Sequence, residues 1–389
     1  MFALPRRLNL LFSIGLALIS ALVIWLGARS VSGATDTTLN SPISVANSVA
    51  TGPSLHNPTL DNHDWYEFNW RYQRAYYDGA WLPDDDNNLN DDIPESSRQD
   101  WRLWFMDGSA IIDTDPEAVY AHAGEAIQMR PYEWRKDDND QEAGLYQPIY
   151  NTTPCLFYEF QMYGQSRPED PSDYRTAALK VGIDQVGWHP DSGTDPAVHG
   201  DFPSTTVWGP AHDHKWTYAP LTVTAEALGN KITVFTYGDA PGGRYHRVLW
   251  DTGSFQEVIP ERLHDPQDLP APGGIYNLEL SSNQPGTTSV EIYWTTIYQS
   301  LGQVYYRQLP SGGTTPPDYP NKVFLPLVIG SGSPDWLVTP LDKTYTNNHI
   351  VTLGGLIPGR SYEFIVVSRG ATDGQCVTWV SDVQSFTKQ

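Results

Sequence analysis

Cysteines and basic residues are scarce in this chain. Its 389 residues include 2 cysteines, 24 lysines and arginines, and 46 aspartates and glutamates, for a net charge of −22. Such a surface repels phosphate backbones, and no basic cluster follows the N-terminal segment, so nucleic acid is excluded as a partner. Two cysteines also exclude a disulfide framework. Cys155 and Cys376 fall in different predicted domains, and we expect both thiols to be unpaired.

The short motifs of common catalytic sites are absent too. The sequence has no Gly-x-Ser-x-Gly turn, no phosphate-binding glycine loop and no His-Glu-x-x-His helix. A carboxylate pair for glycoside hydrolysis needs no fixed spacing along a chain, so that enzyme class stays open. We therefore expect a non-catalytic protein, with a glycoside-active enzyme as the remaining enzymatic alternative.

Long uninterrupted helical runs are lacking, because proline and glycine recur throughout. There are 31 Pro and 32 Gly, and the 12% of aromatic residues include 14 Trp and 22 Tyr. Strand-like alternations between turn residues predict an all-β fold. A chain of this length exceeds what one core usually holds, so two β-sandwich domains are expected.

The first residues have the features of an export signal. Arg6 and Arg7 precede an uncharged stretch that runs from Leu8 to Ala28. Residues 1–34 are therefore predicted to be either a cleaved signal peptide or a helical membrane anchor. In both cases the rest of the chain is expected outside the cell, secreted or held at the cytoplasmic membrane by this segment alone.

Composition divides the remainder of the chain into four parts. Residues 35–55 form a polar, flexible stalk, and residues 56–258 form the first sandwich. Residues 259–274 contain four prolines and are predicted to be a linker that leaves the domains partly independent. Residues 275–389 form the second sandwich.

Two motifs in the second domain point to a known family. Val290, Ile292 and Trp294 alternate in a strand, and Leu356-x-Pro358-Gly359-x-x-Tyr362 follows. Together they resemble a fibronectin type III domain. The resemblance implies that Trp294 fills the core and that the Tyr362 hydroxyl bonds back to the backbone.

One segment of the second domain departs from that family. Residues 310–342 are an insertion rich in Gly, Pro and Thr, and they enclose the apolar run at 323–329. We interpret this run as an extra strand or flap on the sandwich. The alternative is an exposed edge through which the chain docks on other surface proteins.

The first domain resembles the galactose-binding-like jelly rolls of bacterial carbohydrate-binding modules. The resemblance lies in the opening segment from Asn57 to Asp61, the strand that begins at Gly144, and the closing Trp250-Asp251-Thr252 strand. It implies carbohydrate binding, and a structural calcium held by Asp61 and Asp251. Solvated carboxylates are the alternative.

Two further patterns suggest metal sites less specifically. Residues 84–95 imitate the spacing of an EF-hand loop, but Leu89 replaces the required glycine. His212 and His214 have a spacing that suits zinc or copper, although no third ligand follows at a characteristic distance. For both patterns, solvated loop residues are the favoured interpretation.

Aromatic residues in loops are the best candidates for sugar binding, because a flat ring can stack on the apolar face of a pyranose. The candidate site consists of Trp188, His189, Trp208, His212 and His214. Trp216 and Trp250 lie at or beside predicted strands, and we assign both to the core.

The sequence thus predicts a surface protein that binds glycan through its first sandwich, with the second as spacer or adhesion module. A structural envelope protein that assembles with other proteins is the alternative. Buried tryptophans beside a protruding apolar insertion would favour that alternative.

Overall fold

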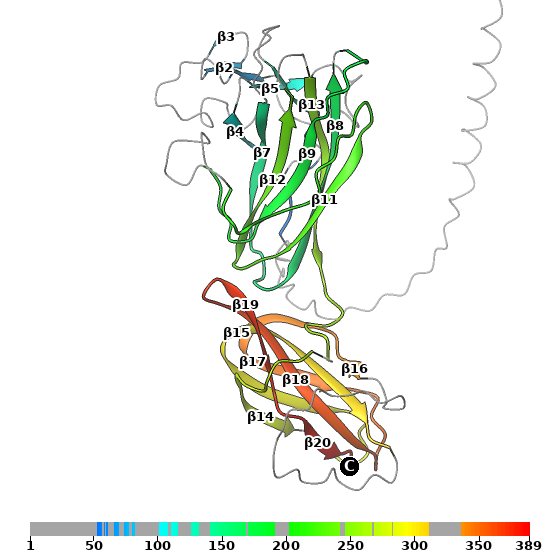
Figure 1. Cartoon of the computed structure of the whole chain (residues 1–389). Helices are drawn as coiled ribbons and strands as arrows, with labels where there is room; N and C mark the ends of the chain where they lie inside the picture. The colour runs from blue at the N-terminus through cyan, green and yellow to red at the C-terminus, as the bar shows by residue number, and fades with distance from the viewer. Residues whose placement is uncertain are drawn as a thin grey trace, which may run out of the picture. The chain divides into compact units, whose positions relative to one another are not determined.

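The structure is a computed structural model. It describes residues 53–56, 58, 60, 66–69, 74–77, 80–81, 101–107, 110–115, 126–131, 141–168, 170–190, 202–241, 246–266, 268–281, 283–310 and 336–389. Every regular element in these ranges is a β-strand, and the strands pair antiparallel in three sheets, which confirms the all-β prediction (Figure 1). Across the same ranges, no helix has the length and apolar character needed to cross a membrane. The predicted signal or anchor at 1–34 lies outside them.

Two of the sheets make up the first sandwich. The larger has the order β11-β8-β13-β6-β5-β1-β2-β3, and the smaller has the order β10-β9-β12-β7-β4. The larger sheet contains β1 (Tyr66–Asn69), β2 (Arg74–Tyr77), β3 (Ala80–Trp81), β5 (Ala110–Asp115), β6 (Ala126–Pro131), β8 (Phe157–Pro168), β11 (Ala219–Glu226) and β13 (His246–Val258). The smaller sheet contains β4 (Arg102–Asp107), β7 (Gln141–Tyr150), β9 (Ala178–Asp184), β10 (Thr206–Trp208) and β12 (Lys231–Ala240).

Strand alternation gives the five-stranded sheet two different faces. Successive side chains of a strand point to opposite sides of a sheet. In β12, Ile232 and Val234 belong to the main core, whereas Phe235 and Tyr237 belong to a separate aromatic cluster. We call the side of this sheet that faces away from the main core its outer face.

The opening segment packs against the closing strand of the first sandwich. The Gly253 amide donates a hydrogen bond to the Pro58 carbonyl, at a bulge in β13. The Gln147 side chain accepts from the His56 amide (2.9 Å) and donates to the His56 carbonyl (3.0 Å). Leu60 is fully buried in the main core. The first and last segments of the first sandwich therefore lie next to each other.

The second sandwich is organised around one long strand. The first half of β15 pairs with β14 and β17, and its second half pairs with β18 and β16. The pairing of β15 with β17 is irregular between Thr295 and Ser300 and resumes at Ser300 and Gly302. The strands are β14 (Ile275–Ser281), β15 (Val290–Gln308), β16 (Leu337–Val338), β17 (Asp342–Leu353), β18 (Ser361–Thr372), β19 (Gln375–Val380) and β20 (Gln384–Thr387).

Two contacts in the second sandwich match expectations from its motifs. Trp294 is buried in a cluster with Val304 and Val366, and its indole N–H donates to the Ser368 hydroxyl at 2.8 Å. The Tyr362 hydroxyl accepts a hydrogen bond from the Ile357 amide at 2.8 Å. The core position of Trp294 and the backbone hydrogen bond of Tyr362 agree with what the resemblance implied. The predicted docking run at 323–329 lies outside the described residues.

The proline-rich segment is bound to the second sandwich. Gln303 accepts from the Leu263 amide (2.8 Å) and donates to the Glu261 carbonyl (2.8 Å). The Tyr305 hydroxyl donates to the His264 carbonyl at 2.9 Å. Gln303 and Tyr305 flank Val304, which points into the core of the second sandwich, so they lie on the opposite face of β15. This part of the linker is therefore anchored to that face.

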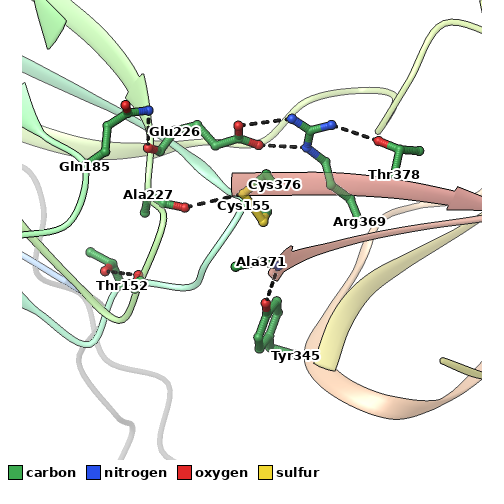
Figure 2. Close-up of a disulfide and its surroundings, with 11 residues drawn as sticks. Thr152, Cys155, Gln185, Glu226, Ala227, Tyr345, Arg369, Ala371, Cys376 and Thr378 are labelled. Atoms are coloured by element: carbon green, nitrogen blue, oxygen red, sulfur yellow. Dashed lines mark hydrogen bonds and ion pairs between the residues drawn. A yellow bond between two sulfur atoms is a disulfide. The ribbon is translucent and has the colours of Figure 1, made fainter. Parts of the chain in front are cut away.

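The two cysteines form a disulfide, so the prediction of unpaired thiols is wrong (Figure 2). Cys155 lies just before β8 and Cys376 lies in β19, 221 residues later. Beside the bond, the Arg369 guanidinium makes two hydrogen bonds to the Glu226 carboxylate, at 2.7 and 3.0 Å. The error arose because sequence separation does not show which loops meet. Disulfides persist in oxidising compartments, which agrees with an extracellular location.

Candidate functional site

Aromatic side chains gather on the outer face of the five-stranded sheet. Phe235 of β12 is fully buried there, under Phe202 (centroid distance 5.0 Å), Trp188 (6.1 Å) and Trp208 (6.2 Å). Trp208 and Trp188 are only partly buried. We call this group the outer aromatic cluster; its members are Trp104, Tyr146, Trp188, Phe202, Trp208, Phe235 and Tyr237.

The backbone of β9 makes room for one of these rings. Gly182 lies directly opposite Trp208 in the pairing of β9 with β10. A Cβ atom at Gly182 would lie 2.6 Å from the Trp208 ring, so any side chain there would push the ring away. Glycine at this position therefore lets the indole lie against the sheet.

A buried carboxylate anchors the loop that carries Trp188. Asp184, at the end of β9, accepts hydrogen bonds from the Trp188 amide (2.6 Å) and the Val186 amide (3.1 Å). It also accepts from the hydroxyls of Thr205 (2.7 Å) and Thr206 (3.1 Å). The Asp184 side chain thus holds both the loop that carries Trp188 and the strand that ends at Trp208. This role was not predicted from the sequence, because an aspartate in a strand carries no distinguishing signal.

The structure separates the five predicted sugar-binding residues into two groups. Trp188 and Trp208 belong to the outer aromatic cluster, and His189 stacks on Tyr146 of that cluster at 5.8 Å. His212 and His214 instead stack on each other at 5.1 Å, in the loop between β10 and β11.

The loop that holds the two histidines is attached to β8, to β9 and to a neighbouring loop; His212 and Leu179 of β9 exchange two backbone hydrogen bonds, each of 2.8 Å. Asp213 accepts a hydrogen bond from the Ser166 hydroxyl. Lys215 donates to the carbonyls of Asp173 (3.0 Å) and Arg175 (2.8 Å). Burial, and secondarily the nearby His212, lowers the pKa of His214. A neutral imidazole can both donate and accept hydrogen bonds. Among the described residues, no ring stacks both on a histidine of this loop and on Trp188 or Trp208.

The predicted metal sites gain no support from the described residues. Asp61 and the 84–95 loop lie outside them. Asp251 is fully buried and accepts from the Thr252 hydroxyl at 2.9 Å. Within the described ranges, the one group with suitable ligand geometry is Cys155, Glu226 and Cys376, and its two sulfurs are already joined to each other. Structural calcium at Asp61 and Asp251 stays a prediction.

One of the two tryptophans assigned to the core is exposed instead. Trp250 is buried as predicted, at 1% exposure, but Trp216 is 38% exposed. Trp216 has a left-handed backbone (φ 63°), and the Arg167 guanidinium lies over its ring at 5.2 Å. The prediction failed because Trp216 lies in the turn before β11 rather than in the strand itself.

A serine, a histidine and an aspartate are aligned in the second sandwich. Ser300 Oγ is 2.9 Å from His349 Nε2, and His349 Nδ1 is 3.4 Å from Asp342 Oδ2. A hydrolytic triad needs a nucleophile that substrate can reach. Ser300 is fully buried and also contacts the Thr296 hydroxyl at 3.1 Å. The array therefore connects β15 to β17 and has no access for a substrate.

Known proteins show only distant similarity to this chain. No protein-family model and no curated protein matches its sequence. The adhesin domain of Epf from Streptococcus pyogenes matches with 8% identity and a TM-score of 0.32, over 83% of this chain and 90% of that one.

Two further structural matches are carbohydrate-binding modules. A tandem of two family-22 modules from Paenibacillus barcinonensis shares 12% identity at a TM-score of 0.28, over 74% of this chain and 94% of that one. A family-61 module solved with β-1,4-galactotriose shares 10% identity at a TM-score of 0.27, over 41% of this chain and 88% of that one. At such scores, these matches carry no conclusion about the function of this chain.

Proposed function

We propose that this is a non-catalytic, extracellular binding protein whose first sandwich, with a jelly-roll framework, binds carbohydrate at the outer aromatic cluster. The observation that carries the proposal is a second aromatic group on the solvent side of a sheet whose other face already forms the main core. Partly buried rings such as Trp208 offer the flat apolar surface on which a pyranose stacks. Trp188 and His189 border the same site.

Catalysis is not part of the proposal, which rests on an aromatic surface and not on a pair of acidic groups. Glycoside hydrolysis uses two carboxyl groups on either side of the scissile bond. Among the described residues of the outer face, Glu142 and Asp239 are direct cross-strand neighbours.

We propose a supporting role for the second sandwich, as a fibronectin type III-like spacer or adhesion module. Its motifs support this assignment, together with the contacts of Trp294 and Tyr362. Ile297, Tyr298 and Ile350 are exposed on its surface. Exposed apolar side chains favour contacts with other surface proteins, which keeps the assembly alternative for this domain.

A glycan-array screen of the full chain, purified in mild detergent, tests the proposal. The screen is run with calcium and with chelator, on the native chain and on Trp208→Ala and Trp216→Ala variants. We expect array binding that Trp208→Ala abolishes and Trp216→Ala leaves intact, because Trp216 lies outside the cluster. A His212→Ala variant tests whether the histidine loop takes part. Silence from a folded native chain would contradict the proposal.

A further inference from the structure

The outer aromatic cluster has a charged edge formed by four residues. Lys180 of β9 lies directly opposite Tyr237 of β12, and Glu142 of β7 lies directly opposite Asp239 of β12. Paired residues of antiparallel strands share a face, so these side chains lie on the outer face with Tyr237. All four are partly exposed. β7, β12 and β9 run side by side in Figure 1. We call these four residues the polar corner.

Lys180 is held over aromatic rings. Its Nζ lies 4.0 Å from the ring centroid of Tyr237 and 4.7 Å from that of Trp208. Burial lowers the pKa of Lys180, while Glu142 and Asp239 act in the opposite direction. Lys180 is thus a donor placed at the border of the aromatic surface, with part of its side chain in solvent.

Glu142 is oriented as an acceptor beside that donor. The Tyr237 hydroxyl is hydrogen-bonded to the Glu142 side chain, and burial, with this bond and the nearby acids, raises the pKa of Tyr237. Glu142 and Asp239 lie directly opposite each other, and both act electrostatically on the nearby Lys180 ammonium. Glu142 thus places an acceptor next to the donor Lys180.

The mixture of charges restricts the class of ligand. A sugar acid would meet the two carboxylates of Glu142 and Asp239 against the single ammonium of Lys180, so its own negative charge is disfavoured. A neutral hydroxyl both donates and accepts, so two adjacent hydroxyls can accept from Lys180 and donate to Glu142. The Trp208 ring offers an apolar surface next to these groups.

We propose that the polar corner makes the site selective for neutral pyranose sugars, which stack on Trp208 and share adjacent hydroxyls between Lys180 and Glu142. This inference rests on the proposed function and adds the sugar class and the residues that select it. Sugars with a carboxylate are bound more weakly.

Titration calorimetry on the full chain tests the selectivity. The probes are neutral galactan, xylan and glucan oligosaccharides, with oligogalacturonate as the acidic sugar. The variants are Lys180→Met and Glu142→Gln. The Gln side chain keeps an acceptor for Tyr237, so this variant is informative even if Lys180→Met fails to fold.

The chain supplies a matched control at the other end of β12. Lys231 also lies over an aromatic ring, with its Nζ 5.6 Å from the centroid of Tyr150, and burial also lowers its pKa. It lies six residues before Tyr237 in β12, at the opposite end of the strand. A Lys231→Met variant removes an equivalent charge away from the polar corner.

We expect at least one neutral probe to bind, and about a tenfold loss of affinity in Lys180→Met and Glu142→Gln, with no change in Lys231→Met. Preference for the acidic probe would overturn the inference, and so would neutral binding that both corner variants leave intact. In those cases the proposed carbohydrate function would stand. Absence of binding to every probe would overturn both.

Discussion

The two sandwiches differ in what covers the outer face of a sheet. In the second, Gln303 and Tyr305 on the far side of β15 bind the backbone of the chain's own linker. In the first, the far side of β12 presents Tyr237, and this ring, like those of Trp188 and Trp208 in the same cluster, is only partly covered. Strand alternation produces both faces equally well. The difference shows that the far side of β15 is used for contacts within the protein, whereas the far side of β12 has surface left for a ligand.

A pair of tryptophan variants should separate the core from the outer aromatic cluster. Trp250 is fully buried, so Trp250→Ala is expected to lower the free energy of unfolding by about 3–5 kcal/mol. Trp208 is partly exposed, so Trp208→Ala should cost roughly half as much and remove sugar binding. Urea unfolding measures both changes. Equal losses of stability would show that Trp208 is an ordinary core residue.

Reduction of the disulfide should weaken the connection between the sandwiches. Loss of a native disulfide typically lowers the free energy of unfolding by about 2–5 kcal/mol. We expect reductant to lower the unfolding midpoint of the native chain. A Cys155→Ser, Cys376→Ser double variant serves as the control, because it should unfold early and ignore reductant. A midpoint unchanged by reduction would contradict the structural role of this bond.

The two sandwiches also bury histidines differently, which predicts a pH dependence. Burial lowers the pKa of His246 to about 4, despite the nearby Asp213 and Asp173, and Lys215 and Arg175 lower it further. Between pH 6.5 and 4 the unfolded chain binds a proton that the folded chain does not. Stability should therefore be complete above pH 6.5 and fall by about 3 kcal/mol as the pH drops to 4.

A histidine variant in each sandwich checks this assignment. His246→Phe should flatten the fall in stability between pH 6.5 and 4, measured as unfolding free energy at several pH values. His349→Phe should change that slope less, because Asp342 opposes the effect of burial on the pKa of His349. An unaltered slope in His246→Phe would rule His246 out as the group responsible.

The smallest predicted effect concerns the hydrogen bond of Tyr362. Tyr362→Phe removes the acceptor of the Ile357 amide and should lower the free energy of unfolding by about 1 kcal/mol. Tyr293→Phe is a matched control, because its hydroxyl bonds only to the partly exposed Glu291. Urea midpoints that shift equally in the two variants would mean that the Tyr362 hydrogen bond stabilises the fold no more than the Tyr293 hydrogen bond does.

Local patterns predicted the parts of the fold that depend on neighbouring residues. Alternation along Val290, Ile292 and Trp294 identified the core side of β15, and all three are buried. The Pro358-Gly359 turn located Tyr362 correctly. Such features follow from the two-residue period of strands and from turn chemistry, which are properties of short segments.

Contacts between distant segments could not be predicted in the same way. The disulfide joins Cys155 to a residue that lies 221 positions later, and no local signal marks either partner. Lys180 and Glu142 were missed for the same reason, because only the pairing of β9 and β7 with β12 brings them together. Trp188 and Trp208 were identified by type, yet their separation from His212 depends on loop geometry.

Hydrogen exchange of the full chain, with and without a saturating oligosaccharide taken from the glycan array, tests the central claim most directly. Ligand protection confined to peptides from β9, β10 and β12 would agree with a site at the outer aromatic cluster. Protection in residues 209–217 or in the second sandwich, with none in those three strands, would contradict it.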